Sequence, residues 1–167
     1  MELFCREYGE DRHGAPLVFL HGLFGSSANW RGIARRFSDA YRVLVPDLRN
    51  HGQSPHADDV SFKSQAADVA GLLDASGVEQ AVLVGHSMGG KVAMRLALDA
   101  PERVAALVCV EIAPVPYPGD RFGPIYEGMA AVDPATLTSR QQADERLAAF
   151  LPARQLRSYL LQNLVKE

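Results

Sequence analysis

The chain has 167 residues, of which 47% are apolar, and 17 Lys+Arg against 20 Asp+Glu give it a formal net charge of −3. A slightly acidic domain without a block of basic residues has no electrostatic means of holding a phosphate backbone or an anionic bilayer, so we expect neither nucleic acid nor membrane as a partner. The longest apolar run, Val104–Val110, is far shorter than the roughly 20 residues that cross a bilayer, and the amino terminus does not resemble a signal peptide.

Two cysteines are too few for a disulfide framework. Cys109 lies within an apolar run, where we expect a free thiol to behave as a small hydrophobic side chain. These features predict a cytoplasmic protein.

Short apolar runs without polar alternation recur along the first two thirds of the chain. Such runs are typical of strands that are buried on both faces of a parallel sheet. They cover 17–20, 43–45, 81–84 and 105–110, and a weaker signal near 3–8 predicts one more strand at the amino terminus.

Helical periodicity fills each gap between these runs, over 30–37, 62–73 and 92–97. Ser61 before the second helix, Gly77 after it and Pro101 after the third are typical boundary residues. The order predicts an α/β fold with a doubly wound, mostly parallel sheet.

The pattern changes after Ile112, because prolines and glycines crowd 114–124 and predict a loop. Helical periodicity returns over 125–132, 140–150 and 152–164, where Leu156, Leu160 and Leu164 share one helix face. We therefore expect two parts, an α/β core over 1–113 and a helical part over 114–167.

The clearest chemical motif is Gly85-His86-Ser87-Met88-Gly89, which lies between a predicted strand and a predicted helix that starts near Lys91. This G-x-S-x-G pattern predicts a sharp turn that exposes Ser87 as a nucleophile and directs the Met88 N–H toward an oxyanion. The alternative is a glycine-rich turn in which a serine merely caps the helix. The same stretch also approaches a phosphate-binding loop, but Val92 stands where that loop needs Ser or Thr, so we expect no nucleotide cofactor.

A second turn, His21-Gly22-Leu23, follows the first predicted strand. Its Leu23 N–H is the expected partner of Met88 N–H in an oxyanion hole, with His21 and Gly22 beside the substrate. The alternative is an ordinary strand-to-helix turn.

The segments HGLFGSSANW, VLVPDLRNHGQS, VLVGHSMGG and VEIAPVPY together resemble the α/β-hydrolase superfamily, and within it the YbfF-type acyl-ester hydrolases. The resemblance covers nearly the whole chain. It implies an α/β-hydrolase fold, Ser87 as nucleophile, Leu23 and Met88 as oxyanion donors, and a helical lid that starts at Pro114.

The resemblance also implies a catalytic acid and a catalytic histidine. Glu111 occupies an early position for the acid, at the end of a predicted strand, although YbfF-type enzymes have Asp there. The alternatives are a structural or ligand-binding role for Glu111 and a later Asp as the acid. No histidine of this chain matches the family's base, so we expect an incomplete fold that stops within its lid, on the order of 90 residues short.

Other polar clusters carry weaker signals. The motif formed by Asp47, Arg49 and His51 is expected to pack a loop rather than to catalyse. The group formed by His51, His56, Asp58 and Asp59 lacks the spacing of a metal site, so we expect no metal.

The sequence thus predicts a serine hydrolase that cleaves small acyl esters or thioesters through an acyl-enzyme, without a cofactor. The rival hypothesis is a truncated, non-catalytic module that binds a ligand or partner. The apolar edge at 105–110 lacks covering strands in this chain, so we also expect self-association through that edge.

Overall fold

The computed structural model describes residues 1–117 and 122–165. The chain divides into two compact units, Met1–Pro114 and Val115–Glu167. Part of the predicted loop, including Pro118 and Gly119, falls outside the described residues.

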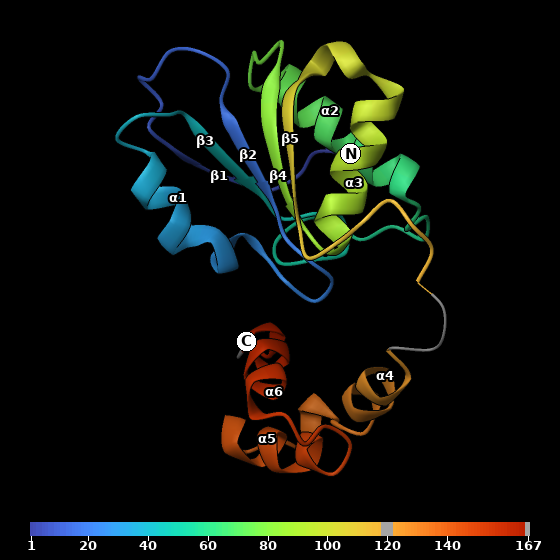
Figure 1. Cartoon of the computed structure of the whole chain (residues 1–167). Coiled ribbons are helices and arrows are strands. Elements are labelled where there is room, and N and C mark those ends of the chain that lie inside the picture. Colours follow the sequence, from blue (N-terminus) through green and yellow to red (C-terminus); the bar gives the residue numbers. More distant parts are fainter. Residues whose placement is uncertain (118–121, 166–167) are drawn as a thin grey trace. The chain divides into compact units, whose positions relative to one another are not determined.

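The first unit is built on a five-stranded sheet with the order β1-β3-β2-β4-β5 (Figure 1). The strands are β1 Cys5–Tyr8, β2 Leu17–Leu20, β3 Val43–Pro46, β4 Ala81–His86 and β5 Val104–Val110. Only β1 runs antiparallel to its neighbour, whereas the other pairings are parallel. The doubly wound, mostly parallel sheet predicted from the sequence is therefore confirmed.

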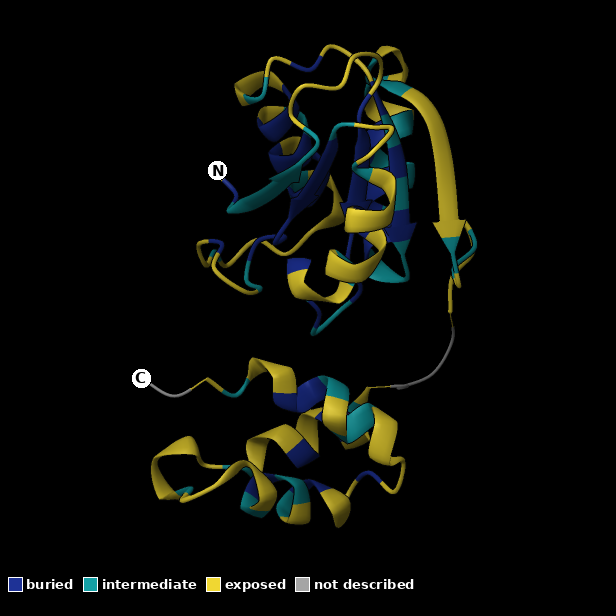
Figure 2. Ribbon diagram, turned by 90° about the vertical axis from the view of Figure 1, so that its left-hand side faces the viewer, coloured by how far each residue is buried: buried dark blue, intermediate teal, exposed yellow. Residues whose placement is uncertain are grey.

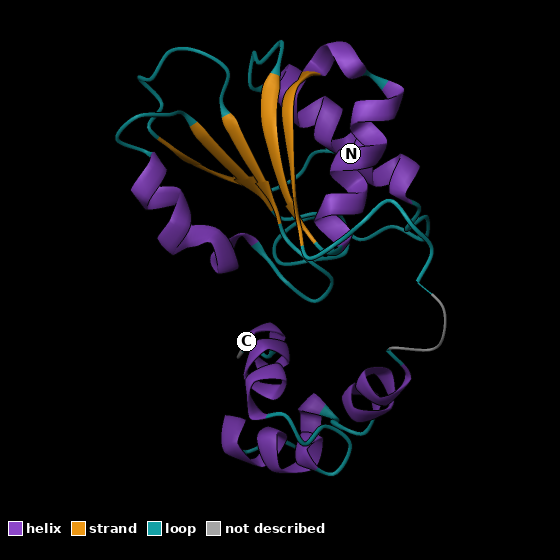
Figure 3. Cartoon of the chain, viewed as in Figure 1, coloured by secondary structure: helices purple, strands orange, loops and turns teal. Residues whose placement is uncertain are grey.

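Helices cover both faces of this sheet, with α1 Arg31–Phe37 on one face and α2 Phe62–Ala75 and α3 Met88–Asp99 on the other (Figure 3). Successive side chains of β2 enter two separate hydrophobic clusters, one on each face of the sheet. Val18 and Leu20 pack in the cluster that includes the buried side chains of α2 and α3, while Phe19 packs toward α1 beside Trp30. A strand with apolar residues on both faces can bury both only between two helical layers.

The expected helix boundaries are confirmed for α2. Ser61 is its N-cap and accepts a hydrogen bond from the Ser64 N–H, and Gly77 follows the helix at a φ of +65°. In contrast, α3 begins at Met88, three residues earlier than expected, directly after Ser87.

The strand β5 departs from expectation in part. It is the edge strand, as expected from its uncovered edge, but residues 105–109 are exposed, whereas the apolar run predicts a strand buried on both faces (Figure 2). Cys109, expected to behave as a small hydrophobic side chain, is likewise exposed. The predicted burial of this strand was wrong, because apolar composition does not show whether other elements of the described chain pack on its faces.

The second unit consists of α4 Gly123–Ala130, α5 Arg140–Ala148 and α6 Arg154–Leu160. The helix predicted over 152–164 is shorter than expected, because α6 ends at Leu160 and Leu164 follows a 3-10 turn instead of extending the face of Leu156 and Leu160. Its buried side chains include Ile125, Leu147, Leu151 and Leu160. No helix among the described residues of the chain is long and apolar enough to cross a bilayer.

Candidate active site

Ser87 lies at the sharp turn between β4 and α3, with φ 50° and ψ −115°. This backbone conformation is strained for a residue with a side chain and is typical of functional sites. The neighbouring glycines explain how the turn closes: a Cβ on Gly85 would lie 2.4 Å from the Gly89 carbonyl oxygen, and one on Gly90 would lie 2.3 Å from the Ile112 side chain. The glycines thus permit a turn at Ser87 that larger residues would block.

The turn after β2 lies against the Ser87 turn. A Cβ on Gly89 would lie 2.4 Å from the Leu20 carbonyl oxygen, so α3 begins in direct contact with the end of β2. A Cβ on Gly22 would lie 3.4 Å from the Ser87 Cβ. The structure therefore brings together Ser87 and the turn that holds Leu23, the two elements from which an oxyanion hole was expected.

Glu111 directly follows β5 and adopts a positive φ of 53°. Its carboxylate Oε2 lies 3.1 Å from Nε2 of His86, and its side chain is 78% exposed. Sequence reasoning did not foresee this contact. The parallel pairing of β4 with β5 was the available signal, because it puts residues that end adjacent strands at the same edge of the sheet.

His21 is fully buried, and both of its ring nitrogens bind the backbone. Nδ1 lies 2.9 Å from the Gly22 carbonyl oxygen, and Nε2 accepts a hydrogen bond from the Leu48 N–H at 2.9 Å. His51 packs beside it, with ring centroids 5.0 Å apart. These contacts fix the turn after β2 on the loop after β3, so the geometry favours a supporting rather than a substrate-binding role for His21.

Acid should destabilise this arrangement. Burial lowers the pKa of His21 to about 4, and burial also lowers the pKa of His51. An unfolded histidine titrates near pH 6.5, so the unfolded chain takes up protons first as the pH falls. We expect full stability above about pH 6.5 and a loss of about 2 kcal/mol between pH 7.5 and pH 5, measured by urea unfolding. An NMR titration in which the folded chain protonates His21 near pH 6.5 would contradict this.

Asp47 stabilises the loop after β3, as expected from its motif. Its carboxylate accepts hydrogen bonds from the Ser27 N–H at 2.5 Å and from the Gln53 N–H at 2.9 Å. Gly52 is required beside it, because it has a φ of +55° and a Cβ there would lie 2.1 Å from Asp47 Oδ2. Asp47 thus connects the loop to the start of the segment that leads into α1.

Arg49 forms a buried ion pair that the sequence did not indicate. Its Nε and one terminal nitrogen lie 2.6 and 2.8 Å from the two carboxylate oxygens of Asp68 in α2. The hydrogen bond to Asp68 raises the pKa of Arg49. The pair fixes the loop after β3 to α2, consistent with the loop-packing role expected for this motif.

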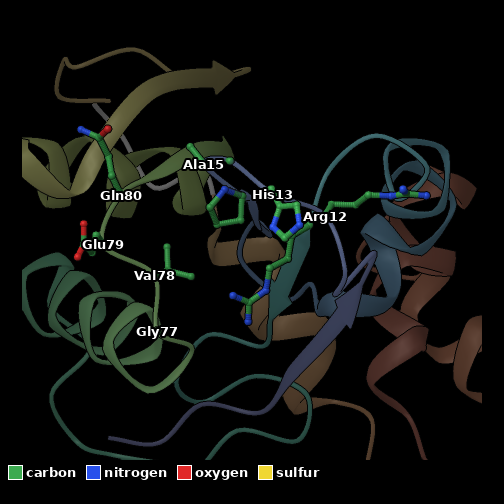
Figure 4. A pocket seen from close by; sticks show the side chains of 10 residues that line it. Arg12, His13, Ala15, Gly77, Val78, Glu79 and Gln80 are labelled. Atoms are coloured by element: carbon green, nitrogen blue, oxygen red, sulfur yellow. The ribbon is translucent and has the colours of Figure 1, made fainter.

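A shallow pocket of about 450 Å³ lies at the other end of the strands (Figure 4). Its lining includes Arg12, His13 and Pro16 just before β2, and Glu79 and Gln80 just before β4. Since Ser87 follows the carboxyl end of β4, this pocket is separate from the candidate active site. Among residues 1–117 and 122–165, no group of three or more His, Cys, Asp or Glu side chains is arranged to hold a metal ion.

Comparison with known proteins gives consistent matches. The chain is 44% identical over 157 residues to the sn-1-specific diacylglycerol lipase ABHD11 of Mus musculus, covering 90% of this chain and 51% of that protein. It is 35% identical over 153 residues to esterase YbfF of Escherichia coli, covering 92% and 60%. The solved structure of a marine microorganism esterase matches with a TM-score of 0.95 and 37% identity, covering 100% of this chain and 65% of that one.

The chain thus spans between about half and two thirds of the length of these relatives. The family model described as alpha/beta hydrolase fold matches residues 15–161, which include the turns at Ser87 and Gly22 and the contact between Glu111 and His86. With the sheet order, the strained serine and this match in agreement, the chain belongs to the α/β-hydrolase fold family.

Proposed function

We propose that this chain carries the nucleophile half of a serine hydrolase that cleaves carboxylic esters or thioesters of small acyl groups. The observation that carries the proposal is the strained Ser87 at the start of α3, in contact with the turn after β2. The names of the relatives, an esterase and a diacylglycerol lipase, support ester substrates.

In the proposed mechanism, Ser87 Oγ attacks the carbonyl carbon of the ester while a histidine takes up its proton. The N–H groups of Leu23 and Met88 donate hydrogen bonds to the oxyanion that forms. The tetrahedral intermediate then expels the alcohol or thiol, which receives the proton from the histidine, and leaves an acyl group on Ser87. Water releases the acid in a second step, with the same histidine as base.

We assign the triad acid to Glu111 and the base to a histidine that is not among the five of this chain. The contacts of two of these histidines support this assignment. His21 is occupied by backbone groups on both ring nitrogens, and His51 Nδ1 lies 2.8 Å from the Arg49 carbonyl oxygen. The helical unit formed by α4, α5 and α6 is proposed as part of a lid.

Supplying the missing base tests this proposal. We expect the chain alone to hydrolyse p-nitrophenyl acetate only at a trace rate, because an unassisted serine hydroxyl is a poor nucleophile near pH 7. Added imidazole should raise the rate of Ser87 labelling by a fluorophosphonate by at least about tenfold, as a diffusible general base.

The control is the same assay with Ser87→Ala. It measures the direct reaction of imidazole with the reagent, and this rate is subtracted. Full turnover without imidazole would show that one of the five histidines is the base. No Ser87-dependent reaction even with imidazole would favour the non-catalytic module instead.

We also propose self-association through β5. The Val110 carbonyl oxygen of β5 accepts a hydrogen bond from the Ser87 N–H, so the backbone groups of Val110 point toward the segment that follows β4. Because successive residues of a strand direct their backbone groups to opposite sides, residues 105, 107 and 109 direct theirs to the open edge. An apolar open edge promotes pairing with another chain, and lysine on an edge opposes it. Light scattering should show oligomers that Val108→Lys, at a side chain now 46% exposed, converts to monomers. A monomeric parent at high concentration would contradict this proposal.

A further inference from the structure

His86 and Glu111 meet at the carboxyl edge of the sheet because of the strand register. His86 is the last residue of β4 and pairs with Val110, the last residue of β5, so Glu111 is the first residue beyond the pairing. The imidazole Nε2–H donates to Glu111 Oε2 at 3.1 Å. Ser87 follows His86 directly, so this contact adjoins the nucleophile.

Glu111 gains orientation from this contact. Its side chain is 78% exposed and has several rotatable bonds, so solvent alone would leave the carboxylate in many orientations. A catalytic acid must instead present one oxygen in a defined direction, because its role is to orient an imidazole. The hydrogen bond from His86 restricts Oε2 in this way.

The opposite edge of the His86 ring lies against the turn after β2. A Cβ on Gly22 would lie only 2.9 Å from His86 Nδ1. The ring is therefore confined between the Gly22 backbone and the Glu111 carboxylate, with its side chain 35% exposed. A glycine at position 22 is what allows the ring to occupy this place.

We infer that His86 is a positioning residue that holds Glu111 through Oε2 and leaves Oε1 to accept a hydrogen bond from the catalytic base. This inference depends on the proposed function, in which Glu111 is the triad acid. A carboxylate has lone pairs for both donors at once. The mechanism gives His86 no proton to transfer, so its effect on the reaction passes through Glu111.

The experiment compares two substitutions of His86 in the imidazole-stimulated labelling of Ser87. His86→Gln keeps an N–H donor, whereas His86→Phe keeps a planar ring without one. We expect His86→Phe to lower the rate constant about tenfold and His86→Gln to restore at least half of the parent rate. A role limited to filling the space beside Gly22 would give the reverse order, and that order would overturn the inference.

A double-mutant comparison tests whether the effect passes through Glu111. Glu111→Gln alone should lower the rate constant at least about tenfold. The same change of the acid to its amide in an intact triad lowers kcat about 10⁴-fold. In the Glu111→Gln background, His86→Phe should change the rate less than about twofold. An equal loss in both backgrounds would overturn the inference and leave the proposed function intact. The matched control is His13→Asn, at the other end of β2, which should leave the rate unchanged.

A parent chain without any Ser87 labelling would contradict the proposed function rather than the contact itself. A crystal structure tests the contact on which the inference rests, since it should show His86 Nε2 within 3.5 Å of a Glu111 carboxylate oxygen. A larger separation would overturn the inference.

Discussion

Replacing Ser87 with alanine should abolish covalent labelling by a fluorophosphonate when imidazole is supplied as the base. Labelling at this position should be lost altogether, because the alanine side chain has no oxygen for the fluorophosphonate to phosphonylate. The fold should persist, since the side chain of Ser87 makes no capping hydrogen bond to α3. Stopped-time labelling followed by intact mass measures the rate, and circular dichroism checks the fold.

Ser38→Ala provides the matched control for this substitution. Ser38 lies at the carboxyl end of α1, where its hydroxyl donates to the Arg35 carbonyl oxygen. Its removal should leave the labelling rate unchanged. A Ser87→Ala variant that still labels within tenfold of the parent would exclude Ser87 as the nucleophile.

The largest effect on stability is expected from Asp68→Ala. The Asp68 side chain is 2% exposed and binds two nitrogens of Arg49, whose side chain is 10% exposed. Removing one partner leaves a buried charge uncompensated, which costs about 3 kcal/mol or more. The Met1 ammonium group, 2.7 Å from Asp68, would lose its partner as well. Chemical unfolding should therefore show a lower midpoint with an unchanged slope.

An exposed pair of the same kind gives the comparison. Arg95 and Asp99 of α3 lie 2.7 Å apart, with side chains 40% and 39% exposed. Asp99→Ala should cost only about 0.5 kcal/mol, because solvent screens the pair. Equal effects of the two substitutions would show that the Arg49–Asp68 pair does not fix the loop after β3 to α2.

Local patterns in the sequence were sufficient to predict most of the first unit. Buried strands β2, β3 and β4 each lie in a short apolar run, and the capping residue Ser61 marks the start of α2. Ser87 could be singled out because glycines on both sides permit a sharp turn between a strand and a helix. These signals are local, so a single sequence contains them.

Features that depend on which elements are neighbours could not be predicted in the same way. The uncovered edge at β5 was expected, but the exposure of residues 105–109 depends on which elements pack on the faces of this strand, and composition does not show that. The contact between His86 and Glu111 requires the register of two strands, and the Arg49–Asp68 pair requires the packing of a loop on a helix. Such contacts join residues distant in the chain and arise only with the tertiary fold.

Mapping the site of the covalent adduct tests the central claim most directly. The chain is incubated with a fluorophosphonate and imidazole, digested, and sequenced by mass spectrometry. The account predicts a single stoichiometric adduct on Ser87, at the turn between β4 and α3. An adduct on another residue, such as the exposed Cys109, or no adduct at all, would contradict it.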